Sequence, residues 1–162
     1  MPEIESLLTR LVECRVAFVI VGGYAAMAHG VTLLTQDLDI SLDFGVENLV
    51  RLQEALANLH PVHRMTPQRL PFHIDADDEK AVPLRNLYLD TDFGQLDCLG
   101  DVKGLGGFQE VVRLSAKVAL AGGMCSILGI EGLIRAKEAM GRPHDQLTIL
   151  QLKAIQQRQK DH

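Results

Sequence analysis

Residues 37–43, DLDISLD, alternate polar and apolar side chains without a break. Side chains two residues apart on a strand point to the same side of a sheet, so this segment is predicted to be a strand with one polar face and one apolar face. Three of the four residues on the polar face are aspartates, although Asp is uncommon in strands. The segment is therefore either the wet face of an ordinary amphipathic strand or a place where carboxylates gather around a metal ion.

The apolar spacing of the remaining chain predicts helices and strands in alternation. Residues 60–85 contain four prolines and are expected to be mostly loop with one short strand, and their acidic run DADDEK (75–80) is expected to be a solvated loop. We expect helices at 3–14, 24–30, 46–59, 130–140 and 143–158, a buried strand at 17–21 ended by Gly22-Gly23, the strand at 37–43, and hairpins over 86–100 and 116–129.

Strands and helices are interspersed, but several of the strands are joined by hairpins, so the sheet should contain both parallel and antiparallel pairs. The predicted class is therefore α+β. The length of 162 residues suits a single domain over 1–162, with a core at about 1–128 and a helical C-terminal part at about 129–162.

The composition excludes several function classes. A net charge of −5 argues against broad nonspecific binding to nucleic acid, which depends on Lys and Arg contacts to phosphates. Three widely spaced cysteines suggest neither a disulfide framework nor a structural zinc site. A charged N-terminal segment and the lack of an apolar run of about 20 residues favour a cytoplasmic protein without a membrane partner.

Two aspartates spaced as Asp37 and Asp39 have Cα atoms roughly 6.5–7 Å apart on one face of a strand and can converge on one hard cation. Mg²⁺ prefers oxygen ligands and commonly takes only one or two protein carboxylates, leaving its other positions to water and substrate phosphates. Taken alone, such a pair more often marks a solvated strand face. A strand ending in Gly-Gly a short helix upstream favours the metal-binding interpretation.

The run VGGYAAMAHG…TQDLDI resembles the signature of the DNA polymerase beta-like nucleotidyltransferase superfamily. The resemblance implies the nucleotidyltransferase fold, a mixed β-sheet flanked by helices with a helical C-terminal tail. It also implies that Asp37 and Asp39 bind the metal ions, and that Asp97 in GQLDCLG completes the site and helps to activate the attacking hydroxyl. Gly22 and Gly23 would let the backbone approach the nucleotide, although a tight strand-to-helix turn explains them equally well.

The C-terminal run LIRAKEAMGRPHDQLTILQL resembles the helical tail of bacterial abortive-infection toxin nucleotidyltransferases. That likeness implies that Lys137 and Asp145 lie close to the metal site and that Arg142 contacts a phosphate. Without it, Lys137 is a lysine that extends past the core to solvent, and Asp145 is an acid favoured by the first turn of a helix.

One position departs from the toxin-type pattern. That pattern has Gly-x-x-Arg-x-Thr before the aspartate pair, and here Gly30 and Thr35 match it while Leu33 replaces the Arg. Thr35 is carried over as a nucleotide-binding residue. The missing cation leaves open a weakened catalyst or an altered choice of substrate.

These residues together predict an enzyme that uses Mg²⁺, or Mn²⁺ in its place, to move a nucleoside monophosphate from an NTP to an acceptor hydroxyl. The acceptor is expected to be an RNA end, a protein or a small molecule. The alternatives are a catalytically weakened nucleotide-binding protein and a toxin–antitoxin component that acts through an antitoxin partner.

Overall fold

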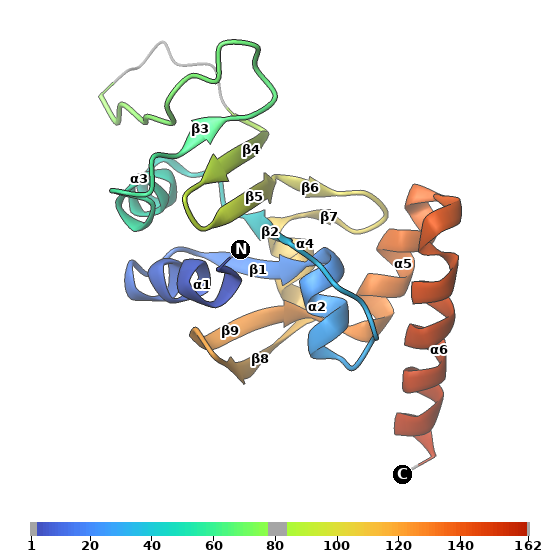
Figure 1. Cartoon of the computed structure of the whole chain (residues 1–162). Helices are drawn as coiled ribbons and strands as arrows, with labels where there is room; N and C mark the ends of the chain where they lie inside the picture. Colours follow the sequence, from blue (N-terminus) through green and yellow to red (C-terminus); the bar gives the residue numbers. More distant parts are fainter. Residues whose placement is uncertain (1–2, 78–83, 162) are drawn as a thin grey trace.

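A seven-stranded sheet with the strand order β3-β4-β5-β2-β1-β9-β8 organises the chain (Figure 1). The structure is a computed structural model that describes residues 3–77 and 84–161. The strands of the sheet are β1 (Phe18–Val21), β2 (Asp37–Leu42), β3 (Val62–His63), β4 (Asn86–Thr91), β5 (Gly94–Leu99), β8 (Ser115–Leu120) and β9 (Gly123–Leu128), and a separate ribbon consists of β6 (Asp101–Val102) and β7 (Gly106–Gly107).

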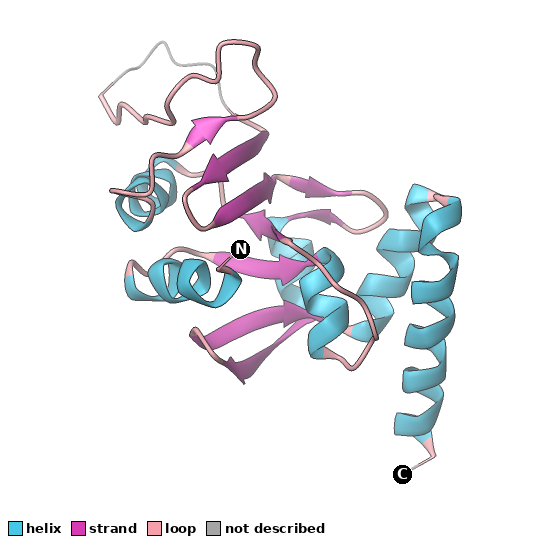
Figure 2. Ribbon diagram, viewed as in Figure 1, coloured by secondary structure: helices cyan, strands magenta, loops and turns pink. Residues whose placement is uncertain are grey.

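The helices flank this sheet (Figure 2). They are α1 (Ile4–Glu13), α2 (Gly22–Ala28), α3 (Val46–Ala55), α4 (Phe108–Arg113), α5 (Ile130–Met140), the 3₁₀ turn η1 (Pro143–Asp145) and α6 (Gln146–Lys160). In Figure 1, α5 and α6 stand together at one side of the sheet, and α1 and α3 lie toward the other. The pairs β2–β5 and β1–β9 are parallel and the other pairs in the sheet are antiparallel. The α+β class, the mixed sheet and the helical C-terminal part are therefore confirmed.

Strand β2 is an interior strand, with β5 on one side and β1 on the other. Its apolar residues Leu38, Ile40 and Leu42 are buried, as the alternation predicts. On the opposite face, Ser41 is fully buried, whereas Asp37 and Asp39 are only partly covered. Because β2 has a neighbour on each side and Ser41 on its polar face is fully buried, a solvated edge strand does not explain this face.

Most of the predicted elements are present, and the differences have local causes. Helix α3 ends at Ala55, although the leucine spacing predicted an end at Leu59. Leu56 and Leu59 remain buried beyond the end of the helix. The chain turns there through Asn58 and His60, both with positive φ, so the leucine spacing indicates burial in this stretch and not helix. The predicted helix at 143–158 begins as the turn η1, and α6 then continues to Lys160.

Two elements between β5 and β8 were not predicted. The ribbon β6–β7 and the helix α4 are both very short, and their glycine-rich sequence carries no clear apolar period. The predicted loop over 60–85 does contain one short strand, β3. In the acidic run 75–80, Asp75 and Asp77 are exposed, and residues 78–80 lie outside the described residues. Within 3–77 and 84–161, no helix has both the length and the apolar character that a membrane crossing requires.

The turn of the β8–β9 hairpin packs directly against α1. A Cβ atom on Gly122 would lie 2.6 Å from Leu8 Cβ and 3.0 Å from the backbone nitrogen of Thr9. We expect Gly122→Ala to lower the free energy of unfolding by about 1–3 kcal/mol, because the helix backbone must move to admit the methyl group. Urea unfolding measures this change. Ala121→Ser, at an exposed position of the same turn, should stay within about 0.5 kcal/mol of the wild type, and equal stabilities for the two variants would contradict the expected packing.

Candidate functional site

Asp39 lies in a row of residues that crosses the centre of the sheet. Its Cα partner is Val21 on β1 and Asp97 on β5. Asp97 is in turn opposite Tyr88 on β4. Because neighbouring strands are about 4.8 Å apart, Asp39 and Asp97 are adjacent carboxylates on parallel strands. Asp37, two residues before Asp39, is opposite Gln95.

Within residues 3–77 and 84–161, the groups that hydrogen-bond to Asp37 are neutral. With its amide nitrogen turned toward Asp37, the Gln95 side chain donates hydrogen bonds of 3.1 and 3.2 Å to the two carboxylate oxygens. The hydroxyl of Thr35 donates to the backbone oxygen of Asp37 at 3.1 Å and accepts from its backbone nitrogen at 3.4 Å. Thr35 therefore fixes the start of β2, and this role accounts for its position without a nucleotide.

The two glycines that follow β1 make close approaches inside the protein. Gly22 has a φ of +68°, and a Cβ atom there would lie 2.5 Å from Asp39 Oδ2. A Cβ on Gly23 would lie 3.3 Å from atoms of Leu33 and Thr35. Gly22 is thus required by both its backbone conformation and the Asp39 carboxylate. A tight turn from β1 into α2 therefore explains much of the need for glycine at positions 22 and 23, without a bound nucleotide.

The environment of Asp39 opposes its ionisation. The pKa of the Asp39 carboxyl is raised to about 6, first by burial and then by the negative charges of Asp97 and Asp37, while the positive charges of Arg64 and Lys137 act against this rise. Perturbed carboxyl pKa values of this kind are concentrated at functional sites, because active sites bring like charges together in partly buried places. Asp39 is accordingly the electrostatic centre of the candidate site.

Asp97 forms an ion pair that the sequence did not predict. The two guanidinium nitrogens Nη1 and Nη2 of Arg64 donate to its two carboxylate oxygens, the second at 3.1 Å. Arg64 directly follows β3, within the proline-rich segment expected to be mostly loop. No pattern in that segment marks this residue, because its place depends on the pairing of β3 with β4.

A second cluster lies where α5 meets η1. Asp145 accepts hydrogen bonds from Lys137 Nζ at 3.3 Å and from Arg142 Nε at 2.7 Å, and its side chain is only 6% exposed. Burial alone would raise the pKa of Asp145, but the hydrogen bond from Arg142 and the charge of Lys137 hold it below its usual value. Lys137 is 11% exposed and does not extend to open solvent. A lysine that extends to solvent and an acid favoured by a helix terminus are therefore incomplete descriptions of Lys137 and Asp145. Asp145 forms ion pairs with both Lys137 and Arg142.

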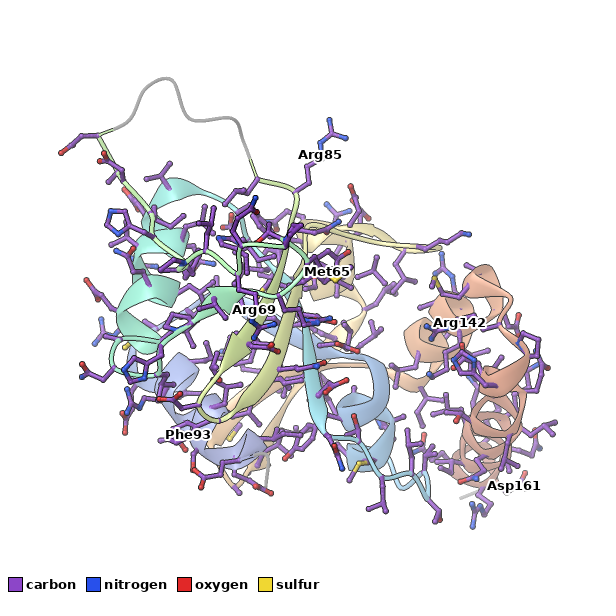
Figure 3. All side chains as sticks on the ribbon, turned by 45° about the horizontal axis from the view of Figure 1, so that its top comes forward. Met65, Arg69, Arg85, Phe93, Arg142 and Asp161 are labelled. Atoms are coloured by element: carbon purple, nitrogen blue, oxygen red, sulfur yellow. The ribbon has the colours of Figure 1, made fainter. Side chains whose placement is uncertain are left out.

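A pocket of about 160 Å³ joins the two groups of residues. Asp39 and Gly22 line it on one side, and Lys137 and Arg142 line it on the other. Lys103, in the unpredicted ribbon, contributes a further cation. Figure 3 shows Arg142 beside the C-terminal helices, whereas the labelled Arg85 projects away from the protein. The rest of its lining is apolar and includes Leu99, Leu133 and Met140. Since pockets for whole small-molecule ligands are usually about 300–1,000 Å³, this one suits only part of a ligand.

Gly104 brings the ribbon onto α5, and so brings Lys103 to the pocket. Gly104 has a φ of +87°, and a Cβ on it would lie 2.7 Å from Ala139 Cβ. Arg135 Nη2 also donates to the Gly104 carbonyl oxygen at 3.4 Å. A larger hollow of about 700 Å³ lies beyond the other end of β2, near Asp43 and Phe108, and none of the three candidate metal ligands lines it. Asp39 is the one candidate metal ligand that lines the smaller pocket.

The carboxylates fit a magnesium ion in part. Asp37 and Asp39 offer the oxygen ligands that Mg²⁺ prefers, and two protein carboxylates are enough for it. Asp97 has both oxygens directed at Arg64. Among residues 3–77 and 84–161, the side chains as they stand form no group of three His, Cys, Asp or Glu that could hold a metal ion. Asp37 and Asp39 thus match the ion in the chemistry of their donor atoms, and Asp97 can join only if its contact with Arg64 changes.

Comparisons with protein-family models and with curated proteins find no match for this chain. The resemblance to nucleotidyltransferases thus rests on the residues and spacings quoted above.

The raised pKa of Asp39 makes a prediction about stability. A carboxyl whose pKa is higher in the folded state than in the unfolded state loses its stabilising contribution as the pH rises through the folded value, here between about 4 and 6. Asp39→Asn removes the ionised group, so it should stabilise the protein by about 2 kcal/mol at pH 8 and by much less at pH 4.

Urea unfolding at the two pH values tests this expectation. Asp43→Asn is the matched control, because Asp43 lies four residues along the same polar face and an Asn there can still accept the hydrogen bond from Gly45. We expect this control to stay within about 0.5 kcal/mol of the wild type at both pH values. A stability gain for Asp39→Asn that is equal at pH 4 and pH 8 would rule out ionisation as its cause.

Proposed function

We propose that this protein is a Mg²⁺-dependent nucleotidyltransferase that moves a nucleoside monophosphate from an NTP to an acceptor hydroxyl and releases pyrophosphate. The observation that carries the proposal is the arrangement around Asp39. A carboxylate with a raised pKa, flanked by Asp37 and Asp97, shares one pocket with Lys137 and Arg142. This pocket places the Asp39 carboxylate, a ligand for a cation, beside positive charges that would bind phosphates.

Asp37 and Asp39 would hold the metal ion, either Mg²⁺ or Mn²⁺, through their carboxylate oxygens. When bound, the ion neutralises charge on the phosphates and orients the attacking group. Gly22 keeps the space beside Asp39 Oδ2 free of a side chain. This supports the assignment of Asp39 as the central ligand.

Lys137 and Arg142 would bind the phosphates of the nucleotide, with Lys103 as an additional cation. Arg142 can offer two parallel donors to a phosphate, whereas Lys137 acts as a point charge. Asp145 does not line the pocket, and it instead holds both cations in place. We therefore assign Asp145 a positioning role.

In the proposed reaction, the oxygen of the acceptor hydroxyl forms a bond to the α-phosphorus of the NTP, and the bond from that phosphorus to the pyrophosphate oxygen breaks. The hydroxyl proton passes to a carboxylate oxygen, for which Asp97 is the candidate. The acceptor hydroxyl belongs to an RNA end, a protein side chain or a small molecule. A transfer assay with each class of acceptor separates these cases.

A second candidate function is a nucleotide-binding protein with little or no catalysis, such as a toxin–antitoxin component that acts through an antitoxin partner. Two observations favour it. Leu33 replaces the Arg of the toxin-type pattern, and Asp97 is engaged by Arg64. A protein of this kind would still bind an NTP through Lys137 and Arg142.

The transfer reaction is tested by incubating the protein with labelled NTPs, Mg²⁺ and each class of acceptor. We expect label transfer from the wild-type protein and background transfer from the double variant Asp37→Ala/Asp39→Ala, because both proposed metal ligands are lost. Asp43→Asn should retain transfer. Transfer that survives the double substitution would rule out this site.

Calorimetry with an NTP and Mg²⁺ separates the second candidate from the first. Metal-dependent NTP binding without transfer to any acceptor is expected from a nucleotide-binding protein. In that case, Asp39→Asn should weaken binding by about tenfold or more, since an interaction of about 1.4 kcal/mol corresponds to a factor of ten. Binding that is unchanged by Asp39→Asn would contradict both functions.

A further inference from the structure

Arg64 is built into the same row of residues as the candidate metal ligands. Its backbone nitrogen donates to the backbone oxygen of Tyr88 at 2.9 Å, which extends the pairing of β3 with β4. Tyr88 is opposite Asp97, and Asp97 is opposite Asp39. The side chain of Arg64 therefore reaches across one strand to the carboxylates from a segment far away in the sequence.

The contact between Arg64 and Asp97 is specific in geometry. Two guanidinium nitrogens face two carboxylate oxygens, an arrangement that aligns two charge-assisted hydrogen bonds. The guanidinium carbon also lies 5.6 Å from the centre of the Tyr88 ring, within the range of a cation–π contact. Both charged side chains are less than one-fifth exposed, so water screens the pair only partly.

This contact conflicts with metal coordination by Asp97. A divalent cation that used an Asp97 oxygen would lie close to the guanidinium, and like charges at short range in a partly buried place repel strongly. Without a metal, the positive charge of Arg64 offsets the repulsion between Asp97 and Asp39 and acts to lower the pKa of Asp39. Arg64 and a divalent cation would thus each supply the positive charge that compensates the carboxylates.

We propose that Arg64 is the resident counter-ion of the cluster formed by Asp37, Asp39 and Asp97, and that a divalent cation competes with it for Asp97. Binding of the metal to all three carboxylates then requires Arg64 to leave Asp97. This inference rests on the proposed metal site. Arg64 is also a cation close to the site, although Leu33 stands at the position where the toxin-type pattern has an Arg.

A nearby ion pair provides the matched control. Arg69 pairs with Asp90, which lies on β4 opposite Gln95, and the Arg69 side chain is 53% exposed. Replacing Arg69 removes one positive charge from the same region of the sheet without touching Asp97. A general effect of net charge would therefore appear in Arg69→Gln as well as in Arg64→Gln.

The test is calorimetric titration of Mg²⁺, without nucleotide, into the wild type, Arg64→Gln and Arg69→Gln at pH 8. We expect Arg64→Gln to bind Mg²⁺ about tenfold more tightly than the wild type, because its competitor is gone. Arg69→Gln should stay within about twofold. Equal or weaker Mg²⁺ binding by Arg64→Gln would overturn the inference.

A second variant and a second measurement cover the case in which Arg64→Gln does not fold. Arg64→Lys keeps the charge but cannot form both hydrogen bonds at once, so it should bind Mg²⁺ more tightly than the wild type but less tightly than Arg64→Gln. In the wild type, the side-chain N–H nuclear magnetic resonance signal of Arg64, identified by its loss in Arg64→Lys, should shift as Mg²⁺ saturates the protein. A signal that does not move would contradict release of Arg64 from Asp97.

The outcomes also separate this inference from the proposed function. Equal Mg²⁺ affinities for the wild type and both Arg64 variants would overturn the role of Arg64 alone, and label transfer by the wild type would still stand. If neither the wild type nor any Arg64 variant binds Mg²⁺, the metal site fails, and the role of Arg64 fails with it.

Discussion

Repulsion between carboxylates is the constraint on which the rest of this site depends. The pairing of β2 with β5 puts Asp39 beside Asp97, and the alternation of the strand puts Asp37 on the same face. Burial alone already raises the pKa of a carboxyl at the position of Asp39, and the negative charges of Asp97 and Asp37 raise it further. The surrounding cations are arranged to offset this, with Arg64 on one flank and Lys137 on the other. The carboxylates of the strands and the cluster of Lys137, Arg142 and Asp145 therefore meet at one small pocket, which Asp39, Lys137 and Arg142 line.

Much of the fold could be predicted from the sequence, because periodicity reports burial directly. The strands at 17–21 and 37–43 and the two hairpins follow from residue patterns that a central or a paired strand requires. The ends of elements were less predictable. Leu59 continues the spacing of α3 after the helix has ended, since a buried leucine satisfies the core from a turn as well as from a helix.

Residue patterns indicated the acidic half of the candidate site, and the likeness of the C-terminal run indicated Lys137, Arg142 and Asp145, but nothing in the sequence indicated Arg64 and Lys103. Asp37 and Asp39 are neighbours in sequence, and Asp97 lies in a strand with a clear pattern. Arg64 and Lys103 come from a proline-rich segment and a glycine-rich ribbon, where no periodicity indicates what a side chain faces. Their positions depend on strand pairing and on a close glycine contact, both of which form between distant parts of the chain. Long-range electrostatic partners of this kind leave no local signal.

The parallel pairing of β2 with β5 also has a consequence for how the chain assembles. Parallel neighbours cannot be joined by a tight turn, and here the connection runs through α3, β3 and β4 before β5 comes to lie beside β2. Contacts between residues so far apart in sequence tend to form slowly, because a long loop must close before they stabilise the chain. The hairpins β4–β5 and β8–β9 are local and can form early. Asp39 and Asp97 are brought together only by this non-local pairing, so we expect the electrostatic cost of the site to arise after the local hairpins have formed.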